Sequence, residues 1–493
     1  MTVSTVTATR LRPQKDIPGP KPMPILGWKG TVLSYMHNPL QGLESLKNRY
    51  GEIAAVPAGG NSESGTGTVV IFGSVNNRIL LSRADTFYNR PAAGVAAPDQ
   101  SATGRKRVLL RLGPGLFGMN GPEHRHQRTD VTPAFHKNSV PFYHEVMVEE
   151  AERMLSGWAP GTVQEIWSDL MSVTLSVLAK TLLQIDLGEK APALSLNLLR
   201  WLNQASKLPV MLFQSDVPGT PYWHFLNLSE QVEQEMTTLI KQIPGGIKYG
   251  EKNVLSMLSR RQNPSSGCPF VSDDELCGHL IAFLLAGQTT APTLVAWTLL
   301  LIAQHPNVAE KLYDEIEKAL GGRSPSIEDI DRMPYLEKVI KETMRIFPPV
   351  PITGRYLVEP VEMSGYQLQT GSDVICSIFH AHRDPAIYKD PLAFNPARWH
   401  NLQPEFYEYL PFSAGAHNCI GSIFAMRWMM IVLALIMQRF RLCPVPGRRI
   451  DVAVKSTSFP KSGMPMAIFK ADGHFGSSRS QIKGNVNWFL HIN

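Results

Sequence analysis

The stretch Phe412–Gly421, which reads FSAGAHNCIG, predicts a glycine-bent loop that leads a single cysteine into a helix. From Ile420 onward apolar residues recur at helical spacing, so Cys419 is expected in the first turn of that helix. Unpaired backbone N–H groups and the helix dipole favour thiolate over thiol at such a position. The flanking glycines, Gly415 and Gly421, let the backbone approach a flat ligand. A thiolate that faces a flat ligand suggests axial ligation of haem iron.

The pattern F-x-x-G-x-x-x-C-x-G in this stretch, which begins at Phe412, resembles the haem-binding signature of the cytochrome P-450 family, the haem-thiolate monooxygenases. A chance match in a chain of this composition has a probability on the order of 0.001. The resemblance implies a mainly α fold, with a large helical domain and a small β-rich N-terminal subdomain. It also implies haem b as the cofactor and Cys419 as its metal ligand. The alternative is a buried cysteine that acts as a small apolar side chain.

The chain of 493 residues is long enough for about three domains by length alone. No long charged or Ser/Gly-rich linker separates such domains, and the resemblance implies a single catalytic unit at residues 17–470. Residues 1–16 are then a polar N-terminal tail, and residues 471–493 are a C-terminal tail of unknown role. The formal net charge of +6 is small and dispersed, which argues against a nucleic-acid partner. Five cysteines without a C-x-x-C pair argue against a zinc ribbon or a disulfide framework.

Residues 1–16 contain neither an apolar run of membrane-spanning length nor the layout of a secretory signal. In this the chain resembles the soluble bacterial members of the family, and we expect a cytoplasmic monomer. The apolar segment Leu194–Leu228 reads as two core helices joined by a turn, and the resemblance implies that it roofs the substrate channel. Its apolar face leaves peripheral membrane contact open.

Local patterns predict the other elements. The expected elements are an extended Ile17–Pro24, strands at Glu52–Val56, Gly67–Phe72, Met363–Leu368 and Ser372–Ser377, a loop at Ser82–Leu116, helices within Glu145–Leu187, a surface loop at Asn263–Gly267, a long helix from the N-cap Ser272 to about His305, and a buried helix at Ile420–Met437.

Within the long helix, Pro292 has no N–H, so the carbonyl of Gln288 loses its helical partner. Nearby threonine hydroxyls can supply other hydrogen bonds and open the helix locally. A locally opened helix with a free hydroxyl suits the binding of O2 and of a proton-carrying water. The alternative is a helix kinked for packing alone.

The stretch Ala286–Pro292, which reads AGQTTAP, resembles the oxygen-activation motif A-G-x-(D/E)-T of the family. The resemblance implies that Ala286, Gly287 and Thr289 belong to the catalytic stretch, with Gly287 admitting the flat cofactor and Thr290 as the catalytic threonine. Thr289 stands where the motif has an acid. A carboxylate relay from this helix is therefore in doubt, and a water chain or a substrate group is expected to deliver protons instead.

Glu342 and Arg345 are three residues apart on one predicted helix face. Together with Arg398 in Phe394–Trp399 they resemble the structural triad of the family, which holds the cysteine loop. The same E-x-x-R spacing occurs at Glu150 and Arg153, where we expect a solvated helix.

Haem propionates require cations, and the resemblance implies four donors for them: His124 and Arg128 at positions i and i+4, Arg355, and His417 in place of the usual arginine. A solvated helix face is the alternative for the first two. The pairs His124/His126 and His380/His382 lack a third ligand at a metal-site spacing, which argues against zinc.

By resemblance the reaction inserts one oxygen atom of O2 into a lipophilic small molecule, by hydroxylation or epoxidation. Electrons would come from a ferredoxin or flavodoxin-type donor with its reductase, docked on a basic face near Arg125 and Arg427. The alternatives are a peroxide-driven oxygenase, an isomerase or decarboxylase of the same family, and a non-enzymatic haem sensor. Pocket-lining residues are expected in Ser82–Leu116, Leu194–Leu228, Phe283–Gly287, Val350–Thr353 and Thr457–Met464.

Overall fold

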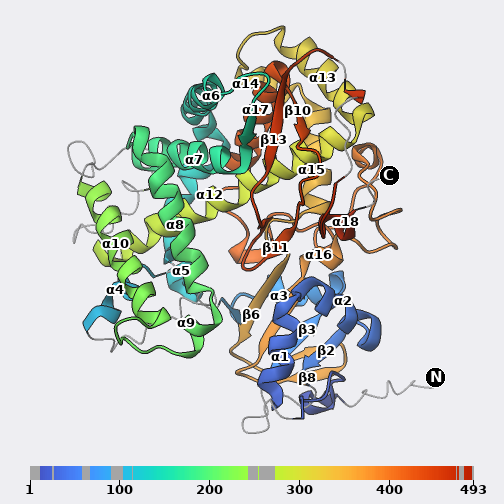
Figure 1. Cartoon of the computed structure of the whole chain (residues 1–493). Coiled ribbons are helices and arrows are strands. Elements are labelled where there is room, and N and C mark those ends of the chain that lie inside the picture. Colours follow the sequence, from blue (N-terminus) through green and yellow to red (C-terminus); the bar gives the residue numbers. More distant parts are fainter. Residues whose placement is uncertain are drawn as a thin grey trace. The chain divides into compact units, whose positions relative to one another are not determined.

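The computed structural model describes residues 11–24, 27–57, 67–89, 104–113, 115–241, 254, 273–473, 475–476 and 482–490. The chain divides into two compact units, which are described separately (Figure 1). The first consists of Met1–Arg90, Ile352–Ile387 and Pro404–Asn418, and the second of Pro91–Pro351, Tyr388–Gln403 and Cys419–Asn493.

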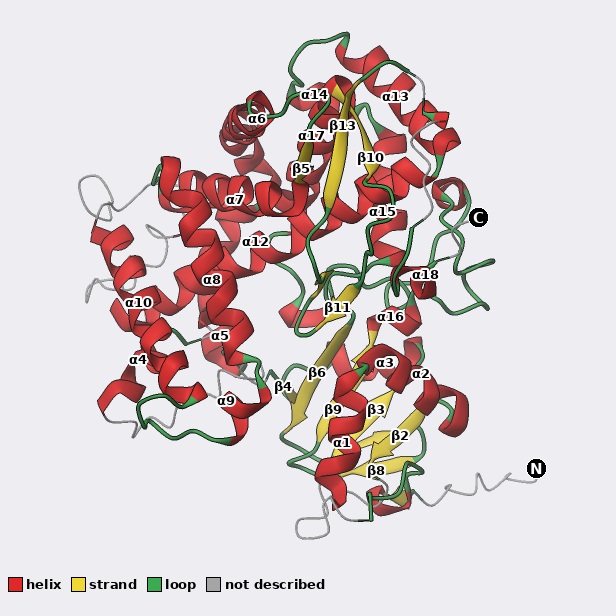
Figure 2. Cartoon of the chain, in the orientation of Figure 1, coloured by secondary structure: helices red, strands yellow, loops and turns green. Residues whose placement is uncertain are grey.

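The first unit is built on a five-stranded sheet (Figure 2). Its strands, in spatial order, are β2 (Ile53–Val56), β3 (Thr68–Ile71), β9 (Asp373–Ser377), β6 (Ile352–Leu357) and β4 (Phe87–Tyr88). Only β3 and β9 pair in parallel among these strands. Apolar side chains of α2 (Pro39–Tyr50) cover one face, while α1 (Gly27–His37), α3 (Ser74–Ser82) and α16 (Ile378–Ala381) complete the unit. The β-rich part therefore includes two later stretches of chain as well as N-terminal residues.

A second sheet of the first unit contains β1 (Arg12–Pro13), β8 (Tyr366–Leu368) and β7 (Val361–Met363). The expectation that residues 1–16 form only a polar tail is wrong for this part. The side chain of Gln14 is buried, and its Nε2 donates to Ser372 Oγ at 2.8 Å. The backbone N–H of Gln369 donates to Gln14 Oε1 at 2.6 Å. Residues 1–10 lie outside the described residues.

The second unit is mainly helical. Its 32-residue helix α12 (Asp273–Gln304) contacts most of the other helices of the unit (Figure 1). The other helices are α4 (Val108–Arg111), α5 (Gly121–Phe135), α6 (Val140–Ser156), α7 (Ile166–Leu178), α8 (Ala191–Ala205), α9 (Leu208–Leu212), α10 (Pro221–Lys241), α13 (Pro306–Leu320), α14 (Ile327–Asp331), α15 (Pro334–Ile346), α17 (Ser422–Arg439) and α18 (Val486–Phe489). Strands β5 (Val163–Glu165), β10 (Phe440–Pro444) and β13 (Pro465–Lys470) form a sheet, and β11 (Val452–Val454) pairs with β12 (Ser458–Pro460).

Most predicted elements are confirmed, including the two early strands and the long helix, which ends at Gln304. The loop predicted for Ser82–Leu116 is partly wrong, because this region contains β4 and α4. The segment Leu194–Leu228 forms parts of α8, α9 and α10. Ser272 and the loop at Asn263–Gly267 lie outside the described residues.

Within the described part of the chain, three helical segments are long and apolar enough to cross a membrane by length and composition: Ile166–Leu183, Glu275–Gln304 and Ser422–Arg439. Burial inside the fold covers 78%, 78% and 61% of these windows, respectively. Their apolar side chains thus contribute mainly to the core of the second unit.

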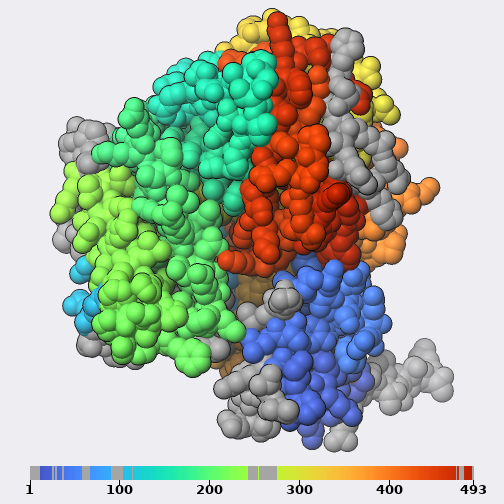
Figure 3. Space-filling view, viewed as in Figure 1, coloured from blue at the N-terminus to red at the C-terminus, as the bar shows by residue number. Residues whose placement is uncertain are grey.

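The described part of the C-terminal segment, Ile482–Leu490, packs on the second unit (Figure 3). Phe489 stacks on Phe347, which stacks in turn on Trp297 of α12, with ring centroids 5.6 and 4.6 Å apart. Asn485 receives a hydrogen bond from the N–H of Val452 at 2.6 Å and donates to its carbonyl at 3.0 Å. This segment therefore holds the β11–β12 hairpin.

Candidate functional site

Cys419 lies just before α17, which begins at Ser422 with Gly421 as its N-cap. The expectation that Cys419 occupies the first helical turn is therefore wrong. The backbone of Gly421 has a ψ of 15°, so the first turn starts only after it, and its carbonyl accepts the N–H of Ala425 at 2.8 Å. Apolar periodicity begins at Ile420, before the backbone becomes helical, which explains the shifted prediction.

Two groups of the chain favour the thiolate of Cys419, but burial opposes them. Part of the residue is exposed to solvent, yet the protein around the sulfur raises the pKa of the thiol by burial. The N–H of Gly421 and the charge of Arg128 act in the opposite direction without reversing the shift. Burial is the largest of these influences, so the net pKa of the Cys419 thiol is raised in the chain alone. A cationic metal centre would deprotonate a coordinating thiol, so this environment fits a metal ligand.

The glycines of the site serve packing between protein segments. A Cβ on Gly415, whose φ is +73°, would lie 1.8 Å from the carbonyl oxygen of Leu81. A Cβ on Gly287 would lie 2.6 Å from a methyl group of Leu178 in α7. The explanation that these two glycines admit a flat ligand is therefore wrong, since the missing Cβ atoms face protein. A Cβ on Gly421 would lie 4.0 Å from the ring of Phe135.

Helix α5 carries two of the predicted propionate ligands on one face. Arg128 lies close enough to Cys419 for their charges to interact. His124 is buried, and burial together with Arg128 and Arg125 lowers its pKa to about 4. At neutral pH His124 is therefore an uncharged donor, so the cation in this pair is Arg128.

The other predicted haem contacts are residues of the first unit. Arg355 on β6 is buried, and its guanidinium donates to Thr353 Oγ1 at 3.0 Å and to the carbonyl of Gly354 at 2.9 Å. Among the described residues it has no carboxylate partner. A buried cation without a counter-ion fits an anionic group such as a propionate. His417 Nδ1 lies 3.0 Å from Asn89 Nδ2, and Phe412 is half-buried in the same loop.

The predicted catalytic stretch lies inside α12, which stays α-helical through Pro292. The hydroxyl of Thr290 donates to the carbonyl of Ala286 at 2.7 Å, and that of Thr289 donates to the carbonyl of Leu285 at 2.8 Å. These bonds do not involve the carbonyl of Gln288 and do not interrupt the helix, so the predicted local opening is wrong. Ala286 and Thr290 keep part of their surface accessible, whereas Thr289 is 6% exposed.

The structure brings Glu342, Arg345 and Arg398 together in the second unit. Arg345 donates to both carboxylate oxygens of Glu342, at 3.0 and 2.9 Å, and Arg398 donates to one of them at 2.8 Å. Trp399 Nε1 and the N–H of Asn395 complete the set of donors at 2.9 and 3.0 Å. Both Glu342 and Arg345 are 0% exposed. Their carboxylate and guanidinium groups thus join α15 to the Pro391–Trp399 segment.

The second E-x-x-R copy is not solvated, which contradicts the prediction. Glu150 is 1% exposed and forms ion pairs with Arg153 and, at 2.6 Å, with Lys180. Lys180 lies in a π-helical turn, Ala179–Leu183, which directly follows α7 and contacts α6. That non-local partner explains why spacing alone could not predict the burial.

Two further predictions can be compared with the structure. Arg427 donates to Asp331 at 2.7 Å and to the carbonyl of Ile327 at 3.1 Å, so an internal ion pair occupies the guanidinium expected on a basic docking face. His380 is buried with Nδ1 2.7 Å from Ser377 Oγ. No group of three or more metal-binding side chains occurs among the described residues.

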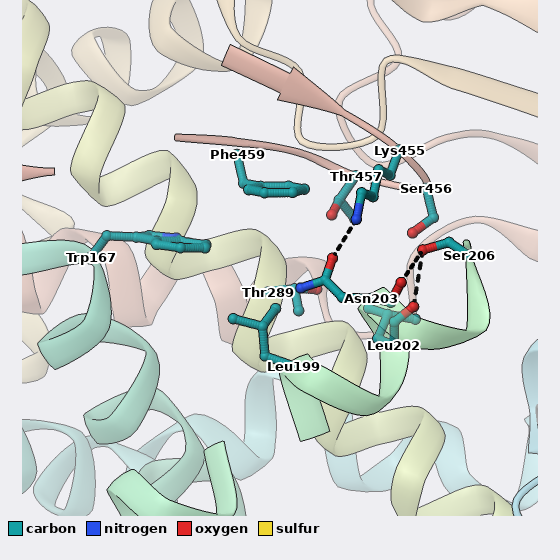
Figure 4. A pocket seen from close by; sticks show the side chains of 10 residues that line it. All are labelled: Trp167, Leu199, Leu202, Asn203, Ser206, Thr289, Lys455, Ser456, Thr457 and Phe459. Carbon is teal, nitrogen blue, oxygen red and sulfur yellow. Dashed lines mark hydrogen bonds between the residues drawn. The ribbon is translucent and has the colours of Figure 1, made fainter. Parts of the chain in front are cut away.

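A small cleft behind Thr289 includes residues of two segments expected to line a pocket, Leu194–Leu228 and Thr457–Met464, but sequence reasoning missed Trp167, Lys455 and Ser456 (Figure 4). Its lining combines Thr289 with residues of α7, of α8 and of the β11–β12 turn. Lys455 donates to Asn203 Oδ1 at 2.7 Å across the cleft. No local motif signals this cleft, because its residues come from distant parts of the chain.

The chain is similar in sequence to a known family and to individual proteins of that family. The family model for cytochrome P-450 matches residues 17–462. The chain is 31% identical over 348 residues to cyclooctatin synthase of Streptomyces melanosporofaciens, covering 69% of this chain and 75% of that protein. It is 29% identical over 345 residues to cyclooctat-9-en-7-ol 5-monooxygenase of the same organism, covering 68% and 74%.

Among solved structures, the retinoic acid bound cyanobacterial CYP120A1 matches with a TM-score of 0.75 at 23% identity, covering 93% of this chain and 99% of that one. This likeness supports the fold, and the family match supports a small-molecule substrate and a redox partner. The chain therefore belongs to the cytochrome P-450 family and is a monooxygenase with a cysteine-ligated haem.

Proposed function

We propose that Cys419 is the haem ligand and that the protein hydroxylates or epoxidises a lipophilic small molecule. The observation that carries the proposal is that Cys419, which lies just before the N-terminus of α17, is the exposed cysteine among the described residues. The other cysteines within the described residues, Cys277, Cys376 and Cys443, are buried.

We propose separate roles for the residues that would bind haem and for Thr290. Haem, when bound, supplies the iron at which O2 is activated. Arg128, Arg355 and His417 would hold its propionates, and His124 would add an uncharged N–H. The hydroxyl of Thr290 can exchange its hydrogen bond to the carbonyl of Ala286 for one to a reacting oxygen or a water.

The names of the relatives support the substrate class. One of them is a monooxygenase of cyclooctat-9-en-7-ol, by its name an unsaturated cyclic alcohol. We therefore propose a lipophilic cyclic compound as substrate, and a ferredoxin or flavodoxin-type donor with its reductase as electron source. A binding-spectrum screen of the purified ferric protein against terpenoid, steroid, lipid and macrolide compounds would test the substrate class.

The ligand assignment has a direct spectroscopic test. The reduced protein with carbon monoxide should show the red-shifted Soret band of thiolate ligation, and Cys419→Ala should lose that band. Cys443→Ala, which removes another cysteine of the second unit, is the matched control and should keep it. A band that survives Cys419→Ala would contradict the assignment.

The reaction type needs a second test, because Thr289 replaces an acid and leaves peroxide-driven chemistry open. Turnover should require a reduced ferredoxin or flavodoxin, and Thr290→Ala should divert electrons to free peroxide. Efficient turnover with hydrogen peroxide alone would instead favour the peroxide-driven oxygenase. Unchanged behaviour of Thr290→Ala would favour a haem sensor.

A further inference from the structure

The β11–β12 hairpin forms one wall of the cleft beside α12. Its turn, residues 455–457, and Phe459 of β12 line this cleft together with Thr289 of α12 (Figure 4). Phe459 also stacks on Trp167 of α7, with ring centroids 5.7 Å apart. The free space in the cleft is about 10 Å³, close to the minimum that holds a single water. A larger ligand can therefore lie between the hairpin and α12 only if the hairpin moves.

The position of the hairpin depends on its contacts with the rest of the second unit, because two strands alone are marginally stable. Among the described strands, β11 and β12 pair only with each other. On the β12 side, the N–H of Ser458 donates to the carbonyl of Pro349 at 2.8 Å, and the Ser458 hydroxyl donates to the carbonyl of Pro348 at 2.8 Å. The C-terminal segment, Ile482–Leu490, binds the β11 side.

Asn485 of the C-terminal segment binds the edge of β11 as a neighbouring strand would. Its Oδ1 accepts the N–H of Val452 at 2.6 Å, and its Nδ2 donates to the carbonyl of Val452 at 3.0 Å. The N–H of Asn485 donates to Asp451 Oδ1 at 2.7 Å. Next to it, the N–H of Ile450 donates to the carbonyl of Lys483 at 2.8 Å. One side chain thus satisfies both backbone groups of Val452 on this edge.

Gly484 shows how closely the C-terminal segment passes β11. Its φ is +120°, and a Cβ on it would lie 2.1 Å from the carbonyl oxygen of Ile450. A residue with a side chain does not fit at this position. Substitution of Gly484 would therefore push the segment away from β11 while leaving every residue of the hairpin unchanged.

Apolar side chains anchor the other end of the C-terminal segment. Val486, Phe489 and Leu490 are buried. Phe489 stacks on Phe347, which directly precedes the two prolines that accept hydrogen bonds from β12. The segment therefore contacts β11 directly and the support of β12 through one aromatic ring, so both strands are held relative to the same buried anchor.

We propose that the C-terminal segment determines which ligands fit beside α12, with Asn485 as the positioning residue that holds the hairpin closed. This inference rests on the proposed function, because a wall beside α12 selects substrates only if oxidation takes place there. Asn485 acts through the hairpin and touches no substrate. When the hairpin is held, a bulky ligand is excluded, and when it is released, the wall opens and admits that ligand.

The test compares Asn485→Ala with Asn487→Ala, a matched control. Asn487 is also exposed, but its side chain donates to the carbonyl of Ile482 within the segment. The probes are imidazole and the much bulkier clotrimazole, which both bind ferric haem through nitrogen and shift the Soret band.

A ligand that needs the open hairpin binds more weakly by the fraction of protein that is open. In Asn485→Ala clotrimazole should therefore bind about 5-fold more tightly, the low end for two lost hydrogen bonds because Asn485 is exposed. The affinity for imidazole should stay unchanged. Asn487→Ala should bind both probes as the parent protein does.

Two further variants change the same contact in other ways. Asn485→Asp keeps the acceptor for the N–H of Val452 and loses the donor to its carbonyl, so its clotrimazole affinity should be intermediate. Gly484→Ala displaces the segment with Asn485 intact and should also tighten clotrimazole binding. Hydrogen exchange measured by mass spectrometry should be faster across β11 and β12 in Asn485→Ala and Gly484→Ala, without any ligand present.

Several results would overturn the proposal. They are an unchanged ratio of clotrimazole to imidazole affinity in Asn485→Ala and Gly484→Ala, unchanged hydrogen exchange in the hairpin, or an equal shift in Asn487→Ala. Loss of haem from Asn485→Ala would do the same, because the segment would then stabilise the fold in general. A carbon monoxide band that persists in the variants leaves the proposed function standing in each of the first three cases.

Discussion

Two buried glutamates in the second unit share the same E-x-x-R spacing but differ in their partners. Glu342 is surrounded by two arginines, a tryptophan N–H and a backbone N–H. Glu150 is paired with Lys180 and with Arg153, whose side chain is 46% exposed. Burial is nearly identical, at 0% and 1%. The difference therefore lies in how many desolvated donors converge on each carboxylate.

This comparison shows what a short motif can and cannot predict. Spacing places Glu and Arg on one helix face in both copies. The carboxylate connects two segments only where the second segment donates hydrogen bonds to it, as Pro391–Trp399 does to Glu342. At Glu150 the lysine of a π-helical turn has that role, with solvent at the edge of the cluster. We thus expect graded losses in the free energy of unfolding when the partners of Glu342 and Glu150 are removed one at a time.

The largest effect is expected for Arg345→Ala. It leaves the carboxylate of Glu342 buried with fewer donors, which costs about 3–5 kcal/mol when a buried pair is broken. We expect protein that lacks haem, because the family resemblance implies that this cluster holds the cysteine loop. Haem content by absorbance and urea unfolding would measure both effects. Arg345→Lys, which keeps the charge but not the two-pronged contact, should be intermediate, and haem-replete Arg345→Ala would contradict the assigned role.

A smaller loss in the free energy of unfolding is expected for Arg398→Ala, because Arg345 and Trp399 still donate to Glu342. Loss of a charged hydrogen bond and of the contacts with the carbonyls of Lys389 and Asp390 should cost about 2–3 kcal/mol. Urea unfolding would check this value, with haem mostly retained. If Arg398→Ala lowered the free energy of unfolding as much as Arg345→Ala does, the predicted order of the two effects would be wrong.

Lys180→Met addresses the other cluster and should cost about 1–2 kcal/mol near neutral pH. Burial lowers the pKa of Lys180, but hydrogen bonds to Glu150 and Asp186 outweigh burial, so the net pKa is raised. A raised lysine pKa contributes stability that is complete below the unfolded value of 10.5 and is lost as the pH rises toward the folded value. The difference between parent and Lys180→Met should therefore shrink above about pH 10.5, as measured by urea unfolding from pH 9 to 11. Arginines do not titrate in this range, so Arg398→Ala should show no such change, and a constant difference for Lys180→Met would contradict the assignment.

The smallest effect is expected for Arg153→Ala. Its side chain is 46% exposed, so the pair with Glu150 is partly screened and should contribute only about 0.2–1 kcal/mol. Raising the salt concentration should reduce the difference from the parent protein in urea unfolding. A cost comparable to that of Lys180→Met would show that Glu150 depends equally on both cations.

The sequence predicted the parts of the site that local pattern encodes. The cysteine loop, the threonines of α12 and the partners of Glu342 follow from short motifs with fixed spacing. The start of α17 was misplaced because periodicity reports burial and not backbone conformation. The cleft at Thr289 was predicted only in part, since Trp167 and Lys455 join its other lining residues only through tertiary packing.

The range matched by the family model stops at residue 462, before β13 and the C-terminal segment. A gene trimmed to that range would lose the strand that pairs with both β10 and β5. It would also uncover the ring of Phe347 and release the hairpin that carries Lys455. Homology-based boundaries would thus give a shortened polypeptide with an exposed aromatic surface and a loosened β11–β12 hairpin, so expression trials should keep the chain through Leu490.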